Sequence, residues 1–352
     1  MHRLRRAGPR PRRRRPAAIA GGAAMRVCIY GAGAIGGHLA ARLAHAGAEV
    51  AIVGRGANLA AIRERGLRLE APDLTVDVHP TATDDPATLG PQDAVIVAVK
   101  APALASIAPL LPALLRPETP VVFAMNGIPW WYFHAHGGPL DGRRIAALDP
   151  GGALWDGVGP QRAAAGVVYA ATTVTAPGVV RVENPKSRLI LGEPDGSESA
   201  RLVALARLFE AAGLAAPVSR RVRDDIWTKL LLNLATGPLC TLAGVGQSAI
   251  AAVPGVRAAM LRVLQEGEAI ARALGRDIRV DAEAIVTGAG KLAHKPSILQ
   301  DYELGRPMEI DALLTVPLAL AGEAGVAAPT LALVAGLLSL RAQAAGLYTP
   351  AA

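Results

Sequence analysis

Three glycines, Gly31, Gly33 and Gly36, form the pattern with the clearest chemical meaning in this sequence. They follow an apolar run at 26–30 and precede a segment with helical periodicity. In that setting the first glycine permits a tight turn, the second lets the backbone approach a pyrophosphate, and the third lets helix and strand pack closely. The free N–H groups at the helix start would face the phosphates. Although glycine loops also serve as plain turns, the complete strand–loop–helix–strand context predicts a dinucleotide site. Its residues are Gly31, Ala32, Gly33, Ala34, Ile35 and Gly36.

The end of the second apolar run, 50–53, indicates which dinucleotide binds. NAD sites usually place Asp or Glu there, on the ribose 2′-hydroxyl. This sequence reads Val53-Gly54-Arg55 instead, and a guanidinium can pair with a 2′-phosphate. The pattern therefore predicts NADPH as the cofactor, with Arg55 as a ligand. The alternative for Arg55 is a solvated surface arginine.

Two further polar residues follow apolar runs that are typical of buried parallel strands. Lys100 comes after the run 95–99, and Asn126 comes after the run 121–125. In an open α/β sheet, ligands bind beyond the carboxyl ends of the strands. We therefore expect Lys100 and Asn126 to face the nicotinamide half of the cofactor. Asn126-Gly127 could equally be a plain turn.

The order of apolar and amphipathic segments predicts how these residues are positioned. Short apolar runs alternate with helical segments up to about residue 213, which is typical of a doubly wound α/β sheet. From about Ser219 to Ala345 the pattern is helical almost throughout. We expect an N-terminal Rossmann domain at 25–218 that binds NADP and a C-terminal all-α domain at 219–345 that provides catalytic and substrate residues.

The formal net charge of +8 comes from one end of the chain. Residues 1–24 hold eight arginines and no acid, so subtracting them leaves 29 basic and 29 acidic residues, a net charge of zero. The remaining chain thus has no net basic field that would indicate nucleic-acid binding. The Arg- and Pro-rich extension cannot bury apolar area, and we expect it to be disordered. It is a poor match to a signal peptide, and we expect a cytoplasmic protein.

Other compositional features favour ordinary roles. Residues 230–256 carry no charge, but two prolines and several polar residues favour a buried helix followed by a turn over a membrane span. Cys28 and Cys240 suit a reducing compartment and have no metal-ligand spacing. His134 and His136 have no evident metal partner in the sequence, so no metal site is predicted.

Several motifs follow the glycine loop in an order that resembles the ketopantoate reductase family, and the resemblance runs from Met25 to about Leu340. The most specific parts are the segments around Lys229 and from Ser297 to Asp311, since neither is general to dinucleotide-binding proteins. The motifs are Val99-Lys100, Asn126-Gly127, Trp227-Thr-Lys229-Leu-Leu-Leu-Asn233, Ser297-Ile-Leu-Gln-Asp301 and Glu309-Ile-Asp311.

The resemblance implies NADPH-dependent reduction of a 2-oxo acid to a 2-hydroxy acid, most directly 2-dehydropantoate to (R)-pantoate in pantothenate and coenzyme A biosynthesis. It implies that Lys229 is the general acid, stabilising charge on the ketone oxygen and delivering a proton. Glu309 would hold the substrate hydroxyl and Ser297 the substrate carboxylate. Asn233 and Asn126 would contact substrate or cofactor. From spacing alone, an interhelical salt bridge is the alternative for Lys229.

Two features depart from the family pattern. The family commonly has a second asparagine four residues after Asn233, where this chain has Gly237. A dense aromatic segment, 130–133, follows Asn126 in a chain with only 3% aromatic residues. That segment could line an enlarged pocket or cap the core at the domain cleft.

These departures leave alternatives for the function. One is a paralogous NADPH-dependent reductase of a different, bulkier 2-oxo acid, and another is a non-catalytic NADPH-binding protein. A third treats the arginine-rich extension as a nucleic-acid-binding arm. The predicted partners are a small-molecule 2-oxo acid and no nucleic acid or membrane, in a monomer or homodimer.

Overall fold

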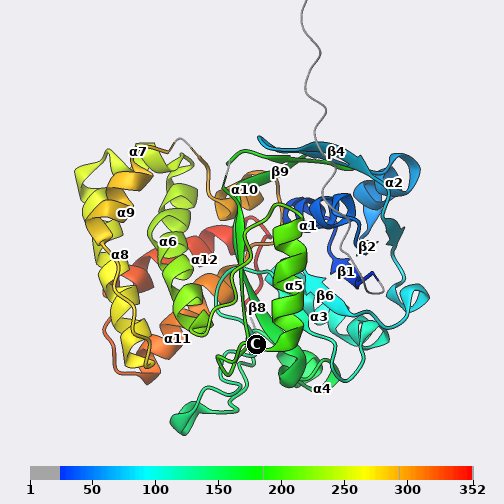
Figure 1. Ribbon diagram of the computed structural model, residues 1–352. Helices are drawn as coiled ribbons and strands as arrows, with labels where there is room; N and C mark the ends of the chain where they lie inside the picture. Colours follow the sequence, from blue (N-terminus) through cyan, green and yellow to red (C-terminus); the bar gives the residue numbers. More distant parts are fainter. Residues whose placement is uncertain (1–23, 185, 293, 351–352) are drawn as a thin grey trace, which may run out of the picture.

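The computed structural model describes residues 24–350 except 185 and 293. A domain built on a mostly parallel sheet comes first and a helical domain follows, as Figure 1 shows with blue to green elements on one side and yellow to red helices on the other. This confirms the predicted fold class, an N-terminal Rossmann sheet with a C-terminal all-α domain. The prediction for the extension 1–24 lies, apart from residue 24, outside the described residues.

The main sheet has seven strands in the order β11-β8-β7-β6-β1-β2-β5. All neighbours pair in parallel except β11, which runs antiparallel to β8. Successive residues of β1 belong to different cores, with Val27 and Ile29 in one buried cluster and Cys28 and Tyr30 in the other. Both faces of the sheet are therefore covered, as the apolar runs predicted. The strands are β1 Arg26–Tyr30, β2 Glu49–Val53, β5 Thr81–Thr83, β6 Ala94–Val97, β7 Val121–Phe123, β8 Ala163–Tyr169 and β11 Arg188–Gly192.

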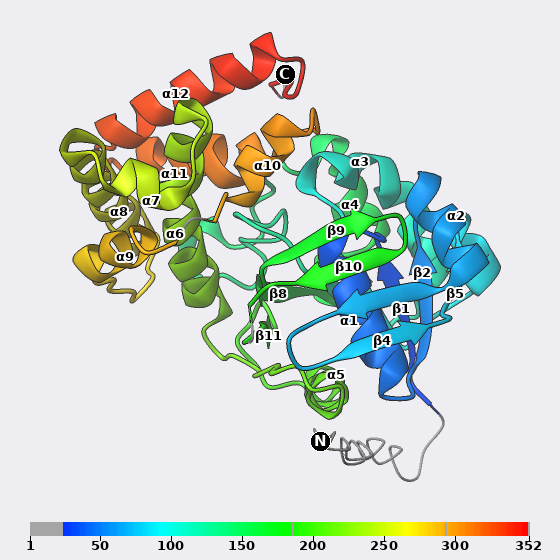
Figure 2. The same cartoon turned by 90° about the horizontal axis from the view of Figure 1, so that it is seen from above.

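A second sheet of four strands, in the order β4-β3-β10-β9, covers the helix that follows the glycine loop. Its strands are β3 Leu67–Glu70, β4 Thr75–Val78, β9 Thr172–Ala176 and β10 Val179–Val182, and the helix is α1 Ala34–His45. Figure 2 shows β9 and β10 lying across α1. A Cβ on Gly37 would lie 2.7 Å from a Val180 methyl, so this helix and the small sheet are in close contact. The pairing of β10 with β3 joins residues more than 100 positions apart, so no local pattern in the sequence indicates this sheet.

Short helices complete the first domain. Four have α-helical geometry, and 3₁₀ turns flank α3, where prolines interrupt the chain. The helices are α2 Gly56–Arg65, α3 Leu104–Ile107, α4 Ala153–Gly157 and α5 Ala200–Ala211.

The helical domain is organised around α6 and α8, which pack side by side (Figure 1). A π-helical turn, Asp311–Thr315, leads directly into α11. In the described residues, no helix is both long and apolar enough to cross a membrane. The helices are α6 Val222–Ala243, α7 Gln247–Ala251, α8 Pro254–Ala273, α9 Ala282–Ala289, α10 Ser297–Glu303, α11 Val316–Glu323 and α12 Pro329–Ala344.

The aromatic segment 130–133 docks α6 onto the first domain. Its four side chains are at most 1% exposed. The Trp227 indole N–H donates to the Tyr132 hydroxyl at 2.8 Å, and one turn earlier the buried Arg223 guanidinium donates to the carbonyls of Tyr132 and His134. The segment therefore caps the core at the junction of the two domains, which is one of the two roles that the sequence left open.

Candidate active site

The three glycines of the loop differ in the space around them. Gly31 has φ +118°, and a Cβ there would lie 2.9 Å from the Ala98 carbonyl carbon. A Cβ on Gly36 would lie 1.8 Å from the carbonyl oxygen of Gly31, so only glycine allows the helix this close to the strand. In contrast, a Cβ on Gly33 would meet nothing within 4 Å. The loop is thus closed on the strand side and open at Gly33, where a pyrophosphate would approach.

Asn58 holds this loop from outside, and sequence reasoning missed it. Its amide nitrogen donates to the carbonyl of Ala32, and its amide oxygen accepts from the Gly178 backbone N–H at 2.6 Å. Asn58 therefore joins the glycine loop to the turn between β9 and β10. The only sequence signal was an asparagine close to the start of α2, and its partner lies 120 residues away.

Arg55 stands at the end of β2 as the residue before α2. Its side chain is exposed, and no hydrogen bond or ion pair to it is found in the described part of the chain. Gly54 beside it packs against Ala32, since a Cβ there would lie 2.8 Å from the Ala32 Cβ. The guanidinium is consequently tethered next to the glycine loop and available to an anion.

Lys100 and Asn126, at the ends of β6 and β7, both face acidic residues of the helical domain. Lys100 forms an ion pair with Asp301 of α10, whose carboxylate is buried. The Asn126 amide donates to Glu309 Oε2 at 3.3 Å. Both residues therefore lie between the sheet and the helical domain, and their contact with a nicotinamide stays a prediction.

Glu309 is a buried acid at the centre of this junction, with 6% exposure. Besides Asn126, the Ala101 backbone N–H donates to it, to Oε1 at 3.2 Å. Burial raises the pKa of Glu309, while the Ala101 N–H and Lys100 act in the opposite direction. A carboxyl group so placed can hold a hydrogen-bond donor of a bound molecule.

Lys229 lies on α6, a helix with local signals at both ends. Asp224 and Asp225 occupy its first turn, where the helix dipole favours acids, and Gly244 ends it with φ 72°. Burial lowers the pKa of Lys229 to about 8, and the charge of Glu309 opposes this shift only in part.

The surroundings of the Lys229 ammonium bear on its expected role. It lies 5.7 Å from the centre of the Tyr169 ring. No carboxylate of the described residues comes within ion-pair distance of it, so the structure does not contain the salt bridge considered as an alternative. The amine is thus free to meet a bound molecule.

Asn233 and Ser297 meet at a small cavity between α6, α10 and the π-helical turn. Its other walls are mostly apolar and include Leu313 and Gly237. A Cβ on Gly237 would lie 2.9 Å from an Ile298 methyl, so α6 and α10 are close here because position 237 has no side chain.

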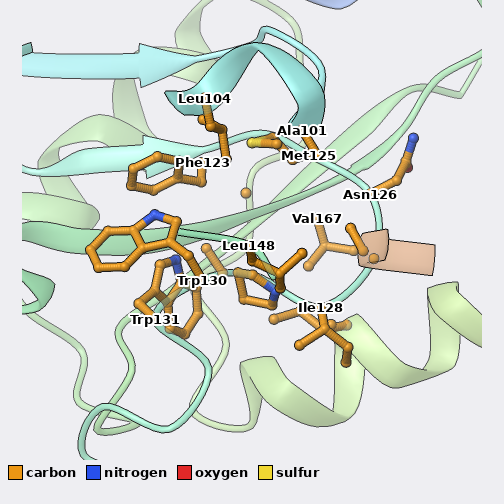
Figure 3. A pocket seen from close by; sticks show the side chains of 16 residues that line it. Ala101, Leu104, Phe123, Met125, Asn126, Ile128, Trp130, Trp131, Leu148 and Val167 are labelled. Carbon is orange, nitrogen blue, oxygen red and sulfur yellow. The ribbon is translucent and has the colours of Figure 1, made fainter. Parts of the chain in front are cut away.

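A larger cavity lies behind Asn126. Figure 3 shows the indole rings of Trp130 and Trp131 on one side of it and Asn126 at the opposite edge. Phe123 and Ile128 also line it. The aromatic segment therefore both caps the core and lines a cavity. No cluster of three or more metal-ligating residues exists in the described ranges.

These features define a class of protein. The chain combines a glycine loop on a doubly wound sheet with a half-buried lysine of lowered pKa and a buried glutamate from the helical domain. This combination is typical of a dinucleotide-dependent oxidoreductase.

Comparisons with known proteins extend this assignment. Residues 27–196 match the family model "Ketopantoate reductase PanE/ApbA", and residues 221–342 match the model of its C-terminal domain. A 2-dehydropantoate 2-reductase of Mesorhizobium japonicum is 44% identical over 92% of this chain and 100% of its own length.

Solved structures agree with these matches. A protein of Ralstonia solanacearum MolK2 assigned to the ketopantoate reductases is 42% identical, with a TM-score of 0.87 over 93% of this chain and 100% of its own. D-Mandelate dehydrogenase in its ternary complex, at 19% identity and TM-score 0.75 over 92% of this chain and 100% of its own, shares the fold. The chain belongs to the ketopantoate reductase family. It is an oxidoreductase that acts on CH–OH groups, and the predicted resemblance is confirmed.

Proposed function

We propose that this protein reduces 2-dehydropantoate to (R)-pantoate with NADPH, the reduction used in pantothenate biosynthesis. The observation that carries the proposal is the pair of Lys229 and Glu309. The lysine has a lowered pKa and no ion-pair partner in the described residues, and the glutamate is buried and interacts with it electrostatically. The strong match to named 2-dehydropantoate 2-reductases supports this choice of substrate.

The proposed cofactor fits the residues of the first domain. The open backbone at Gly33 leaves room for a pyrophosphate, and Arg55 offers a 2′-phosphate a guanidinium that has no partner among the described residues. No Asp or Glu stands at the end of β2 to favour the 2′-hydroxyl of NADH. When bound, the reduced nicotinamide supplies a hydride to the substrate ketone.

The protein's own groups then carry the rest of the reaction. The Lys229 ammonium faces the negative charge that develops on the ketone oxygen, and it donates the proton. Glu309 is held by Asn126 and Ala101 and would accept a hydrogen bond from a substrate hydroxyl. Asn233 and Ser297, which share one cavity, would hold the rest of the substrate, with Ser297 on its carboxylate.

The test is oxidation of NADPH by the purified chain with 2-dehydropantoate, followed by chiral analysis of the product. We expect turnover of about 1–1000 per second and (R)-pantoate as the product. Tight binding of NADPH without turnover of this substrate would contradict the proposal.

One observation favours a second candidate, a reductase of another and bulkier 2-oxo acid. The cavity at Asn233 and Ser297 has Gly237 in its wall, where the family pattern has an asparagine. An apolar branch on the substrate would there meet Ile298 and Leu313 instead of an amide side chain. Higher kcat/KM for such an acid than for 2-dehydropantoate would favour this candidate.

A further inference from the structure

The segment that follows α12 returns to the active site and brackets Glu309. The Leu347 carbonyl accepts the Met308 backbone N–H at 3.0 Å, one residue before Glu309. The Tyr348 hydroxyl donates to Asp311 Oδ1 at 2.6 Å, two residues after it. Figure 2 shows α12 along the outer edge of the helical domain, and the short segment after it contacts residues on both sides of Glu309.

Asp311 opens the π-helical turn, and the same carboxylate oxygen also accepts the Thr315 hydroxyl at 2.7 Å. A π-helical turn is rare and is frequent at functional sites. Here one acid collects two hydroxyl donors, one from inside the turn and one from Tyr348. The conformation of the turn is therefore held partly by a residue far along the chain.

The turn also sets the position of the loop that carries Asn126. The Ala312 carbonyl accepts the Ile128 backbone N–H at 2.9 Å. A Cβ on Gly127 would lie 2.3 Å from that same carbonyl oxygen, so the two backbones are in direct contact. A shift of the turn would therefore move Asn126 as well as Glu309.

From this geometry we propose that Tyr348 is a positioning residue for the reaction: through Asp311 and the π-helical turn it fixes Glu309 and its partner Asn126. The inference rests on the role proposed above for Glu309. Burial and the Asp311 carboxylate raise the pKa of Tyr348, so its hydroxyl stays a donor across the working pH range of an enzyme. Leu347 and Tyr348 also pack against the main core, which anchors the segment.

The test compares Tyr348→Phe, which removes only the hydroxyl, with Tyr302→Phe. Tyr302 is a suitable control because it is also half-buried, its ring lies under Arg341 at 4.7 Å, and no hydrogen bond of its hydroxyl is found in the described residues. We expect Tyr348→Phe to lower kcat about tenfold, since small misplacements of reacting groups are costly. The Kd of NADPH should stay unchanged, because the glycine loop and Arg55 lie in the other domain.

The pH profile separates positioning from simple loss of stability. Glu309 is faced by Lys100, Asp301 and Lys229. If its segment loosens, water reaches the carboxyl group and its raised pKa falls toward the ordinary value. The acidic limb of the kcat profile of Tyr348→Phe should then lie at lower pH than that of Tyr302→Phe, whatever the melting temperatures.

A second pair of variants, at Asp311, tests the same interaction in case Tyr348→Phe does not fold. Asp311→Asn keeps an acceptor oxygen for both hydroxyls and should retain kcat within about threefold, whereas Asp311→Ala should lose at least as much as Tyr348→Phe, because it also removes the bond to Thr315. Adding Tyr348→Phe to Asp311→Ala should change nothing further, because the bond between Tyr348 and Asp311 is already absent.

The outcomes separate this inference from the proposed function. Wild-type kcat and pH profile in Tyr348→Phe would overturn the positioning role. Absence of turnover in the unaltered chain would instead overturn the proposed function.

Discussion

The cofactor half and the catalytic half of this site are built in opposite ways. The glycine loop, Arg55 and Asn58 lie within 28 consecutive positions, 31–58, and the loop's close packing depends mainly on backbone atoms. The catalytic half draws Lys229 from α6, Glu309 from just before the π-helical turn and Asn126 from the end of β7. The first half is formed by residues close together in the sequence, and the second forms only where the two domains meet.

The two halves also differ in how much charge they bury. The glycine loop packs closely because its glycines have no side chains, and residues 31–36 include no charged residue. The junction buries Glu309 and Asp301 and shields Lys229, so all three have shifted pKa values. Shifts of this kind disfavour the charged forms and are typical of groups that transfer or hold protons. We therefore expect changes in the two halves to separate binding from turnover.

The largest effect is expected from Glu309→Gln. The amide keeps the size of the side chain but removes the acceptor charge and reverses one hydrogen bond, so kcat should fall by about 10²–10⁴-fold. NADPH affinity, measured by fluorescence titration, should change little. As a control, Glu303→Gln alters an exposed acid paired with Lys295 and should leave kcat unchanged. A large loss of NADPH affinity in Glu309→Gln would contradict the claim that one half of the site serves cofactor binding and the other serves turnover.

Gly36→Ala should mainly lower the affinity for NADPH. Its Cβ would lie 1.8 Å from the Gly31 carbonyl oxygen, so the loop must move. We expect NADPH affinity to fall about a hundredfold, with a lower melting temperature. Gly33→Ala adds a Cβ in open space and should lower affinity without lowering the melting temperature. Equal losses of stability in both variants would contradict the roles assigned to the two glycines.

Arg55→Ala tests the choice of dinucleotide. Losing charge-assisted hydrogen bonds to a 2′-phosphate should raise the KM for NADPH about 10- to 100-fold and leave the KM for NADH nearly unchanged. Arg65→Ala is the matched control, because Arg65 is an exposed arginine of the same helix region that pairs with Glu64. An unchanged ratio of the two KM values in Arg55→Ala would identify Arg55 as a surface residue.

The pH dependence of turnover should reflect Lys229. Its pKa is lowered to about 8, and the protonated form is the one that donates. Below that pH the ammonium predominates, so the titration of Lys229 should not change kcat there. Above it the neutral amine predominates, and kcat should fall about tenfold per pH unit. A basic limb near the ordinary lysine value would show that Lys229 is well solvated in the working enzyme.

The sequence predicted the local half more completely than the junction. Spacing alone predicted the roles of Gly31, Gly33 and Gly36, since each depends on neighbours within one strand–loop–helix unit. It could not predict that Asn58 bonds to Gly178, or that β10 completes the second sheet, because such pairings are decided by tertiary packing. The catalytic positions of Lys229 and Glu309 came from family resemblance and stay predictions.

The junction between the domains also contains contacts that the residue pattern does not predict. Arg223 and Trp227 hold the aromatic segment, but nothing in their types indicates which carbonyls or hydroxyls they meet. The bracketing of Glu309 by Leu347 and Tyr348 depends on a chain reversal nearly 40 residues later. Such contacts surround Lys229 and Glu309 in space, and they are known only from the three-dimensional structure.

The most direct test of the account measures kcat and NADPH affinity together for the unaltered chain and for Lys229→Met with 2-dehydropantoate. Methionine keeps the volume of the side chain and removes the charge. We predict a loss of kcat of about 10²–10⁴-fold at unchanged NADPH affinity. Turnover by Lys229→Met within a few-fold of the unaltered chain would contradict the claim that this lysine is the general acid.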